Sequence, residues 1–304
     1  MIILGVICYT PYARSVKYEL NLARGTEVRV IEYLDEDEWE ETIGNSITPK
    51  DWFGGDAERE NAKSKFTLRS TDEVKYTTYD IWYLLFVEYI PLEVQHFLLT
   101  GLNQTIFTEE YINTRFDTEY SAWEGIYSEW DFTTETFDDE ADEKEQIMTI
   151  LKDPEDYEEI LNIYNEWVVD TNETLQVYNL TIPTVSQEEI FWSIVKNSLG
   201  IACPVEEYLE ELIDTFQIDN IEVQENKLIF EKEGKKEYIV EIYFDDQGFR
   251  TSFIIKNKNS VIVYKIAGDY STEILLGILS IVLICGFVGI IVLTIKRRKR
   301  IREI

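Results

Sequence analysis

The chain has few of the residues on which many enzymes rely for catalysis. Its 304 residues include one histidine, His96, and three cysteines, Cys8, Cys203 and Cys285. Zinc sites that need several His or Cys ligands cannot be assembled from this set. A Ser-His-Asp triad would depend on His96, and no G-x-S-x-G elbow is present. We therefore predict a protein that is not an enzyme.

The single histidine and the cysteines have simpler interpretations. His96 lies among Val94, Gln95, Phe97 and Leu98, which predicts a histidine in the core. Cys8 and Cys285 lie in apolar terminal stretches, so only Cys203 belongs to the region between them and no disulfide is expected there. Cys203 precedes Pro204 at a predicted helix start and is interpreted as a buried small hydrophobic residue.

Basic residues are also scarce. The chain has 28 Lys and Arg against 59 Asp and Glu, a formal net charge of −31. Without residues 296–304 it has 22 basic and 58 acidic residues, about −36. Such a charge repels phosphate backbones, so nucleic acid is excluded as a partner. The contents of 45% hydrophobic and 13% aromatic residues predict a folded chain.

One long hydrophobic run dominates the carboxyl end. Ile274 to Ile295 is an uncharged apolar stretch of 22 residues, long enough to cross a bilayer as a helix. A basic cluster follows it at Lys296, Arg297, Arg298, Lys299, Arg300 and Arg302. By the positive-inside rule, residues 296–304 form a cytoplasmic tail, and the cluster also attracts lipid headgroups. We therefore predict a single-pass cell-membrane protein with residues 267–273 as a juxtamembrane linker.

The amino-terminal end predicts export. MIILGVICYT is apolar but has no basic residue before it, and Ala13-Arg14-Ser15 has the small residues of a cleavage site. We interpret residues 1–15 as a signal peptide that lacks its first residues. Residues 16–266 then form an extracytoplasmic domain, either as one unit or as subdomains 16–135 and 136–266.

The first half of this region predicts mostly strands. Residues 16–33 suggest two strands with a turn at Gly25, and 65–69 and 74–89 suggest further strands, with 81–89 buried on both faces. The acidic run Asp35 to Glu41 predicts a loop or a short helix, and Pro49 to Gly55 a loop. Helical turns are expected at 94–99 and 109–116.

The second half predicts helices followed by a meander. Asp153-Pro154, the capping box Ser186 to Glu189, and Pro204 each start a segment with an apolar helical face. From Ile218 to Ile266, short strands alternate with turns rich in Gly, Asp and Asn, where positive φ is expected. The fold class is therefore α+β, with antiparallel β-meander sheet packed with helices, plus one C-terminal transmembrane helix.

Two stretches carry a resemblance to known proteins. They are PVEEYLEEL (Pro204 to Leu212) and ENKLIFEKEGKKEYIVEIYFDDQGFRTSFIIKNKNSVIVYKI (Glu225 to Ile266), followed by the apolar run and basic tail. Together they resemble a group of uncharacterised archaeal single-pass surface proteins. More distantly, the helices and meander are similar to lipoprotein domains in which a half-barrel of strands wraps helices around an apolar cavity. The resemblance implies a surface location and brings no catalytic residues.

Several surface motifs are candidate sites. Three sequons place candidate glycans at Asn103, Asn172 and Asn179. Clustered carboxylates at Asp138, Asp139 and Asp142 are candidate calcium ligands, although Glu143 and Thr149 break the EF-hand pattern, and a solvated helix start is the alternative. Trp123 and Trp130, in WEGIYSEW, are candidate aromatic walls of a groove. No other cofactor is expected.

These features favour a surface protein that binds a ligand or partner near the membrane. One alternative is an apolar ligand or lipid in a cavity under the curved sheet. A second is protein or glycan adhesion through the acidic, aromatic surface. A third is a cell-envelope glycosidase, which would need two carboxylates roughly 5 to 9.5 Å apart in a groove with aromatic walls.

The topology yields the first prediction. Without detergent, the full-length protein should remain in the membrane fraction, because the apolar run 274–295 has no polar stripe to face water. Protease added to intact cells should digest the region before Glu273. Recovery of the full-length protein in the soluble fraction would contradict this topology.

Overall fold

A single antiparallel sheet organises the chain. The computed structural model describes residues 17–100, 107–138 and 142–268. The sheet is built from nine strands of these residues: β1 (Gly25–Leu34), β2 (Lys63–Thr77), β3 (Glu119–Thr133), β4 (Glu143–Leu151), β5 (Ile221–Gln224), β6 (Lys227–Glu233), β7 (Glu237–Phe244), β8 (Arg250–Asn257) and β9 (Ile262–Gly268). Their order is β4-β3-β2-β1-β9-β8-β7-β6-β5. The α+β prediction is confirmed, and so is the carboxyl-terminal meander.

The pairing of β1 with β9 joins the two halves of the sheet. Ile31 faces Ile266 in this antiparallel ladder, and the register shifts between Ile31 and Tyr33. A second link comes from β4, which pairs with β3 over nine residue pairs. Strands from residues 16–135 and from residues 136–266 therefore share one sheet.

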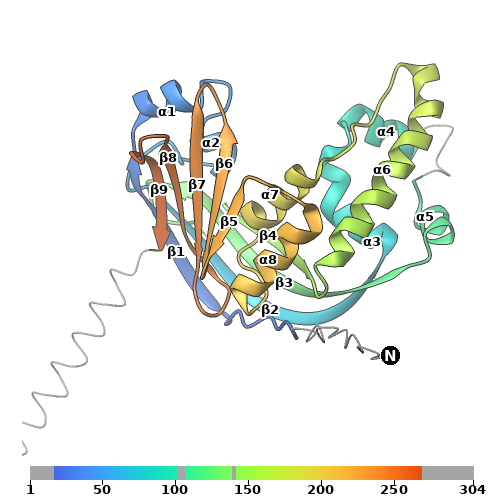
Figure 1. The fold of residues 1–304 in the computed structure, drawn as a ribbon, viewed down its shortest axis with the longest axis horizontal. Coiled ribbons are helices and arrows are strands. Elements are labelled where there is room, and N and C mark those ends of the chain that lie inside the picture. The colour runs from blue at the N-terminus through green and yellow to red at the C-terminus, as the bar shows by residue number, and fades with distance from the viewer. Residues whose placement is uncertain (1–16, 101–106, 139–141, 269–304) are drawn as a thin grey trace, which may run out of the picture.

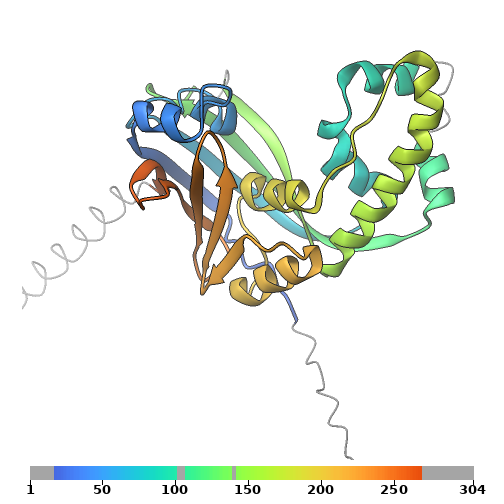
Figure 2. The ribbon, with the colours of Figure 1, turned by 45° about the horizontal axis from the view of Figure 1, so that its top comes forward.

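Helices cover the sheet and extend beyond one end of it. They are α1 (Glu36–Thr42), α2 (Pro49–Phe53), α3 (Thr78–Phe86), α4 (Leu92–Thr100), α5 (Glu109–Arg115), α6 (Glu155–Leu175), α7 (Gln187–Asn197) and α8 (Val205–Phe216), with 3₁₀ turns η1 (Val87–Tyr89) and η2 (Gln176–Tyr178). Figures 1 and 2 show α3 to α6 gathered as a lobe, α7 and α8 between this lobe and the meander, and α1 and α2 at the other side.

The predicted strand at 81–89 is wrong, because the chain turns helical at Thr78. A capping box starts α3: Asp80 N–H donates to Thr77 Oγ1 at 3.3 Å, and Thr77 N–H donates to Asp80 Oδ2 at 3.0 Å. Ile81, Trp82 and Phe86 are buried on one side. The preceding strand β2 runs unbroken from Lys63 to Thr77, whereas the sequence predicts separate strands at 65–69 and 74–89.

Two further predictions for the first half need correction. Residues before Gly25 form only an isolated bridge, in which the backbones of Glu19 and Cys203 exchange hydrogen bonds of 3.0 and 2.8 Å. Within Pro49 to Gly55 the first five residues form α2, because Thr48 and Asp51 make a capping box. The acidic run forms the short helix α1, capped by Asp35, and Trp39 is buried within it.

The helices predicted in the second half are confirmed. α6 begins at Glu155, one residue later than expected, and the Asp153 carboxylate accepts a hydrogen bond from Glu155 N–H at 3.1 Å. Ser186 and Glu189 form the predicted capping box of α7. In the meander turns, positive φ occurs at Gly248, as expected, and also at Glu225 and Ser260, but not at Gly234, where it was expected too.

Aromatic rings fill the interior in two groups. On the meander side, Trp52 meets Trp39, Trp192 and Phe253 with ring centroids 5.7 to 6.3 Å apart. In the helical lobe, Tyr164 stacks on Phe86 at 4.2 Å, and Trp82 lies 5.5 Å from Trp167. The helices that reach away from the sheet therefore carry their own core.

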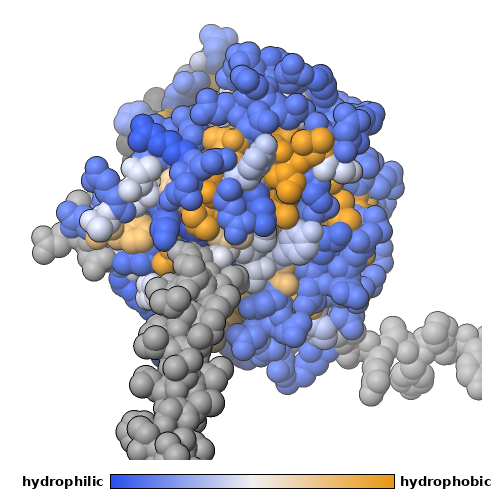
Figure 3. All heavy atoms as spheres, turned by 90° about the vertical axis from the view of Figure 1, so that its left-hand side faces the viewer, coloured by the Kyte–Doolittle hydropathy of each residue, from blue (hydrophilic) through white to orange (hydrophobic). Residues whose placement is uncertain are grey.

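The outer face of the meander mixes apolar and charged side chains. The register sets Glu241 between Ile229 and Ile254, and Glu241 also forms an ion pair with Lys256 at 2.7 Å. Figure 3, which views the side of the molecule where β8 and β9 lie, shows hydrophobic residues gathered within a hydrophilic surround. Glu241 is only 8% exposed on this face, and its ion pair with Lys256 offsets part of the cost of burying its charge.

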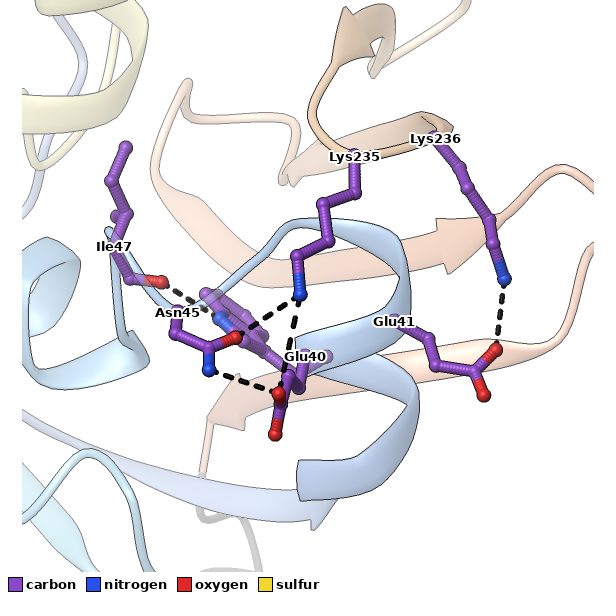
Figure 4. A network of polar contacts seen from close by, with 7 residues as sticks. Glu40, Glu41, Asn45, Ile47, Lys235 and Lys236 are labelled. Atoms are coloured by element: carbon purple, nitrogen blue, oxygen red, sulfur yellow. Dashed lines mark hydrogen bonds and ion pairs between the residues drawn. The ribbon is translucent and has the colours of Figure 1, made fainter.

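A network of polar contacts fastens α1 to the turn between β6 and β7. Figure 4 shows Lys235 reaching Asn45 and Glu40, and Lys236 reaching Glu41 at 2.8 Å. The hydrogen bond from Lys236 lowers the pKa of Glu41. Exposed pairs of this kind contribute little stability individually. The hydrogen bond from Lys236 N–H to Thr42 O, at 2.9 Å, joins the two backbones directly and does not depend on exposed side chains.

The predicted membrane segment 274–295, the tail 296–304 and the leader 1–15 lie outside the described residues, as does most of the linker. Ala267 and Gly268, assigned to the linker, instead end β9. Among the described helices, none has the length and apolarity that a membrane crossing requires.

The start of α6 yields a pH prediction. Burial, with Asp153, Glu159 and Glu155 nearby, raises the pKa of Asp156 to about 6. The native state thus holds this proton more tightly than the unfolded chain, so ionisation costs stability above pH 6 and the cost fades toward pH 4. After allowance for solvent screening, Asp156→Asn should stabilise the protein by about 1 kcal/mol at pH 7.5.

Urea denaturation of the full-length protein at pH 4.5 and 7.5 measures this effect. The stabilisation should shrink strongly at pH 4.5. Glu155→Gln is the control, because Glu155 is exposed one residue earlier on the same turn. Its effect should stay within about 0.5 kcal/mol at pH 7.5. An equal gain for Asp156→Asn at both pH values would contradict the assignment.

Candidate functional site

A polar cavity lies between the sheet and two helices. Its volume is about 380 Å³, within the range of small-ligand sites. Its walls come from β1 to β4, from β8 and β9, and from α2 and α7. Residues far apart in sequence, such as Arg29 and Arg250, therefore meet there only because β1 and β9 pair.

One wall is formed where α2 ends against β3. Trp52 and Phe53 supply its rings, and Gly54 and Gly55 follow with φ of 75° and 54°. A Cβ on Gly55 would lie 2.1 Å from the Phe132 carbonyl oxygen, so a side chain there would displace the loop. Glycine thus allows the chain to approach β3 closely and to shape the cavity.

Arg29 projects from β1 into the cavity wall and is 8% exposed. Its guanidinium carbon lies 4.5 Å from the centroid of the Phe66 ring, and Nη2 donates a hydrogen bond to the Arg250 carbonyl oxygen at 3.4 Å. A planar guanidinium over an aromatic face is a favourable arrangement. These contacts fix the orientation of the Arg29 side chain.

Arg250 enters the cavity from the start of β8. Its Nη1 donates to the carbonyl oxygens of Val195 and Lys196, in the last turn of α7. The carboxyl end of a helix carries a partial negative charge, which suits a cation. Burial, and then the neighbouring Arg29, lowers the pKa of the Arg250 guanidinium to about 9, whereas Glu129 acts in the opposite direction.

Lys196 brings a third positive charge to the lining. It belongs to the last turn of α7, and its side chain is partly buried. Burial lowers the pKa of Lys196; Glu88 acts against this, and Arg250 and Lys232 add to it. The lowered pKa of Lys196 therefore reflects an ammonium group that is partly removed from water and lies near other cations.

The opposite wall carries two acids on β3. Glu129 and Asp131 alternate with Trp130, so they share the face that also presents Tyr127. Asp131 forms an ion pair with Lys144 at 2.6 Å. Burial and then Glu129 raise the pKa of Tyr127 to about 12, with Arg250 and Arg29 acting against them. Tyr127 thus lies close enough to Glu129, Arg250 and Arg29 for their charges to affect its pKa.

The predicted groove aromatics lie on the same strand as these residues. Trp123 and Trp130 are 7% and 4% exposed, and neither lines the cavity. Lys65 Nζ lies 3.9 Å from the ring centroid of Trp130, and Lys152 Nζ lies 5.2 Å from that of Trp123. The cavity instead uses Tyr127 and Phe132 from β3.

The candidate calcium ligands are only partly described. Asp138 and Asp142 are exposed and are linked by a hydrogen bond from Asp142 N–H to Asp138 O at 3.1 Å, whereas Asp139 lies outside the described residues. Elsewhere, a hollow is lined by seven carboxylates, including Asp156 and Glu211. In the described part of the chain, no three His, Cys, Asp or Glu side chains are placed to hold a metal ion.

The sequons differ in their surroundings. Asn172 lies in α6, and its amide donates to Ile182 O and accepts from Ile182 N–H, both at 2.8 Å. Asn179 is exposed and ends η2 with φ of 55°. Asn103 lies outside the described residues.

The single histidine and Cys203 fall in opposite environments. The prediction of a core histidine is wrong, because His96 is exposed on α4 while Val94 and Leu98 face the interior. Cys203 is buried, as predicted, and its Sγ donates to Asp246 O at 3.6 Å. Burial raises the pKa of this thiol, which disfavours its reactive thiolate form.

Sequence reasoning did not single out Arg29, Arg250, Lys196 or Glu129. A signal existed for Arg29, which stands between Val28 and Val30 at a position whose alternation with Ile31 places it on the core face. A basic residue at a core position of a strand needs a special reason. No such signal marked Arg250, because a basic residue shortly after a turn is ordinary and needs no special reason.

Comparison with known proteins gives no further guide to this site. No protein-family model, curated protein or solved structure matches the chain. The function is therefore argued from its own residues.

The sequons yield a prediction. In a host that glycosylates sequons, Asn179→Gln should remove a glycan mass, because the Asn179 side chain is accessible. Asn172→Gln should leave the glycan mass unchanged and destabilise the protein by about 1 to 2 kcal/mol, because both hydrogen bonds to Ile182 are lost. Intact-protein mass spectrometry reads the first effect and thermal unfolding the second. A glycan on Asn172 would refute this distinction.

Proposed function

We propose that this chain is a membrane-anchored surface protein whose extracytoplasmic domain binds a small ligand in the cavity between the sheet, α2 and α7. The observation that carries the proposal is a cavity of about 380 Å³ lined by buried polar groups, among them Arg29 and Ser64. Polar groups out of water need partners, and a cavity that presents several of them favours occupation by a polar ligand.

The sequence supports the surface location. The run 274–295 is proposed to cross the bilayer, and the basic residues 296–302 to contact lipid headgroups on the cytoplasmic side. The ligand would then be bound outside the cell, on the domain that precedes this run. The resemblance to archaeal single-pass surface proteins agrees with this topology, and a relationship to that group is part of the proposal.

The cavity lining favours a polar ligand over an apolar one. Among the described residues, three bases and two acids contribute to the walls, and a lipid tail there would exclude water from these charged groups without offering them a hydrogen bond in return. The apolar-ligand alternative is therefore the weaker one. In the described part of the chain, calcium-assisted adhesion is supported only by carboxylates that are not placed to hold a metal ion, near Asp138 and in the hollow that Asp156 and Glu211 line.

A glycan is the second candidate ligand, because two acids, Glu129 and Asp131, line the cavity. These carboxylates alternate on β3, so their backbones lie about 7 Å apart, and Trp52 and Phe53 flank the same cavity. Paired acids beside aromatic rings suit sugar binding and, at suitable separation, glycosidic hydrolysis. The ion pair of Asp131 with Lys144 favours a structural role for one of the two acids.

Native mass spectrometry of the full-length protein, released from detergent micelles, tests the proposal. The wild-type protein should carry a retained small molecule or bind one from an extract of its own cells. Gln146→Trp should abolish this, because Gln146 is exposed at the cavity lining and a large ring there narrows the entrance. Val177→Trp, at a position 80% exposed in the helical lobe, is the control and should retain the ligand.

The outcomes separate the alternatives. A retained mass in the wild type that Gln146→Trp removes supports ligand binding, and its identity as a lipid, sugar or small anion decides the class. Release of reducing sugar ends from envelope glycans, lost in Glu129→Gln, would establish the glycosidase instead. Equal ligand retention by Gln146→Trp and the wild type would overturn the assignment to this cavity.

A further inference from the structure

We propose that the outer face of the meander rests on the lipid headgroups of the membrane that anchors the chain. The outer face is the side of β6 to β9 that presents Glu241 and Ile254, opposite the aromatic core. The inference rests on the proposed membrane anchor and is independent of the ligand cavity. The cavity lies on the other side of the sheet, beside Phe253 and Trp52, so this contact would hold it turned away from the bilayer.

Four apolar or aromatic side chains on the outer face do not belong to the hydrophobic core of the described residues. They are Ile229 on β6, Ile239 and Tyr243 on β7, and Ile254 on β8. Alternation along each strand sends their neighbours to the core and these four outward. Figure 3, which views this side of the molecule, shows hydrophobic residues at the surface. An exposed apolar patch within polar surroundings marks a contact surface.

The charge of the outer face depends on the distance from the end of β9. Among the described strands β6 to β9, the row of paired residues nearest that end has one base and no acid: Lys227, Tyr243, Ser252 and Ala267. Farther along, Lys256 forms an ion pair with Glu241, and in the last row Glu233 lies opposite Glu237. In a chain of net charge −31, the end of the face beside the proposed anchor is thus the end that anionic headgroups repel least.

A short linker keeps this end of the meander close to the bilayer. Only residues 269–273 separate Gly268, the last residue of β9, from the proposed membrane run that begins at Ile274. Even a fully extended chain of this length spans at most about 20 Å. β9 is the fifth of the nine strands in the sheet, so the anchor follows from the middle of the sheet rather than from an edge. The part of the domain nearest the membrane must therefore include this end of the meander.

Tyr243 and Lys227 suit the boundary between water and lipid. Lys227 Nζ lies 5.9 Å from the centroid of the Tyr243 ring, and Tyr243 Oη donates a hydrogen bond to Glu241 at 2.8 Å. Tyrosine rings are enriched at the level of the headgroups in membrane proteins. A lysine lays its aliphatic stem along an apolar surface while its ammonium group reaches the phosphates. Both residues belong to the row nearest the proposed anchor.

Two other arrangements are compatible with a short linker. The sheet could stand on the turns at this end, which would bring the exposed Glu225 and Asp246 against the headgroups. Their charges disfavour that arrangement on an anionic surface. A second copy of the chain could instead cover the apolar patch. The acid-free row beside the anchor favours the lipid contact, and the three arrangements place different molecules against the same side chains.

The experiment uses the full-length protein in vesicles of phosphatidylcholine and phosphatidylglycerol, with p-benzoylphenylalanine in place of Tyr243 or Ile229. Flotation of the vesicles first shows that the protein is anchored. Irradiation then joins the benzophenone to the molecule that lies against it, and mass spectrometry identifies the adduct by its added mass. Both positions should give lipid adducts, because both side chains belong to the rows that rest on the headgroups.

Two further positions are controls for accidental contact with lipid. Gln247 is exposed in the turn between β7 and β8, and Val177 is 80% exposed in the helical lobe. p-Benzoylphenylalanine at either position should give lipid adducts at least several-fold less often than at Tyr243. Thermal unfolding of each labelled protein close to that of the wild type shows that the fold is retained.

A charge variant tests the role of Lys227. Lys227→Gln should lower, several-fold, the ratio of phosphatidylglycerol to phosphatidylcholine adducts formed by the ring at position 243, because a cation that faces the headgroups is lost. Lys258→Gln is the matched control and should leave the ratio unchanged, since Lys258 is 70% exposed and pairs with Glu237 at the far end of the face. An unchanged ratio in Lys227→Gln would contradict a headgroup contact at this end.

Each outcome of the crosslinking decides a separate point. Lipid adducts at Tyr243 and Ile229, with few at Gln247 and Val177, support the proposal. Adducts mainly at Gln247 mean that the sheet stands on its turns, and the added mass of a whole chain means that a second copy covers the face; either result overturns the proposal. Flotation without adducts also overturns it and leaves the anchor in place, whereas a protein that does not float overturns the anchor as well.

Discussion

The antiparallel ladder between β1 and β9 is the contact on which the rest of the molecule depends. It joins residues 25–34 to residues 262–268 and makes one sheet from four amino-terminal strands and a five-stranded meander. Without it, Arg29 on β1 and Arg250 on β8 would belong to two separate sheets. Contacts between such distant segments are costly in chain entropy, and the large apolar interface they close must compensate for that cost.

The cavity follows from the way this sheet is covered. α2 and α7 pack through the rings of Trp52 and Trp192, whose centroids lie 5.7 Å apart and each 6.3 Å from that of Phe253 on β8. The remaining space is lined by residues from both halves of the sheet. Its polarity comes from a few positions, on β1, β2, β3, β4, β8 and α7, beside the rings of Trp52 and Phe53.

Much of the fold could be predicted from local signals. The capping box Ser186 to Glu189 and the apolar stripe of α8 identified their helices, and the alternation of Tyr238, Val240, Ile242 and Phe244 identified a core-facing strand, since local chemistry decides these elements. Ile81 to Tyr89 misled because a helix buried on most sides is as continuously apolar as a buried strand. The box Thr77 to Asp80 was the available clue. The cavity could not be predicted, because its residues are brought together only by the long-range pairing of β1 with β9.

The position of β9 within the sheet has a mechanical consequence. This last strand is hydrogen-bonded on both sides, to β1 and to β8, and both ladders are antiparallel. Tension applied at Gly268 along the strand would load both rows of hydrogen bonds in shear, so that many must break together, whereas an edge strand could be peeled away one bond at a time. The domain is therefore built to withstand being pulled by its carboxyl end.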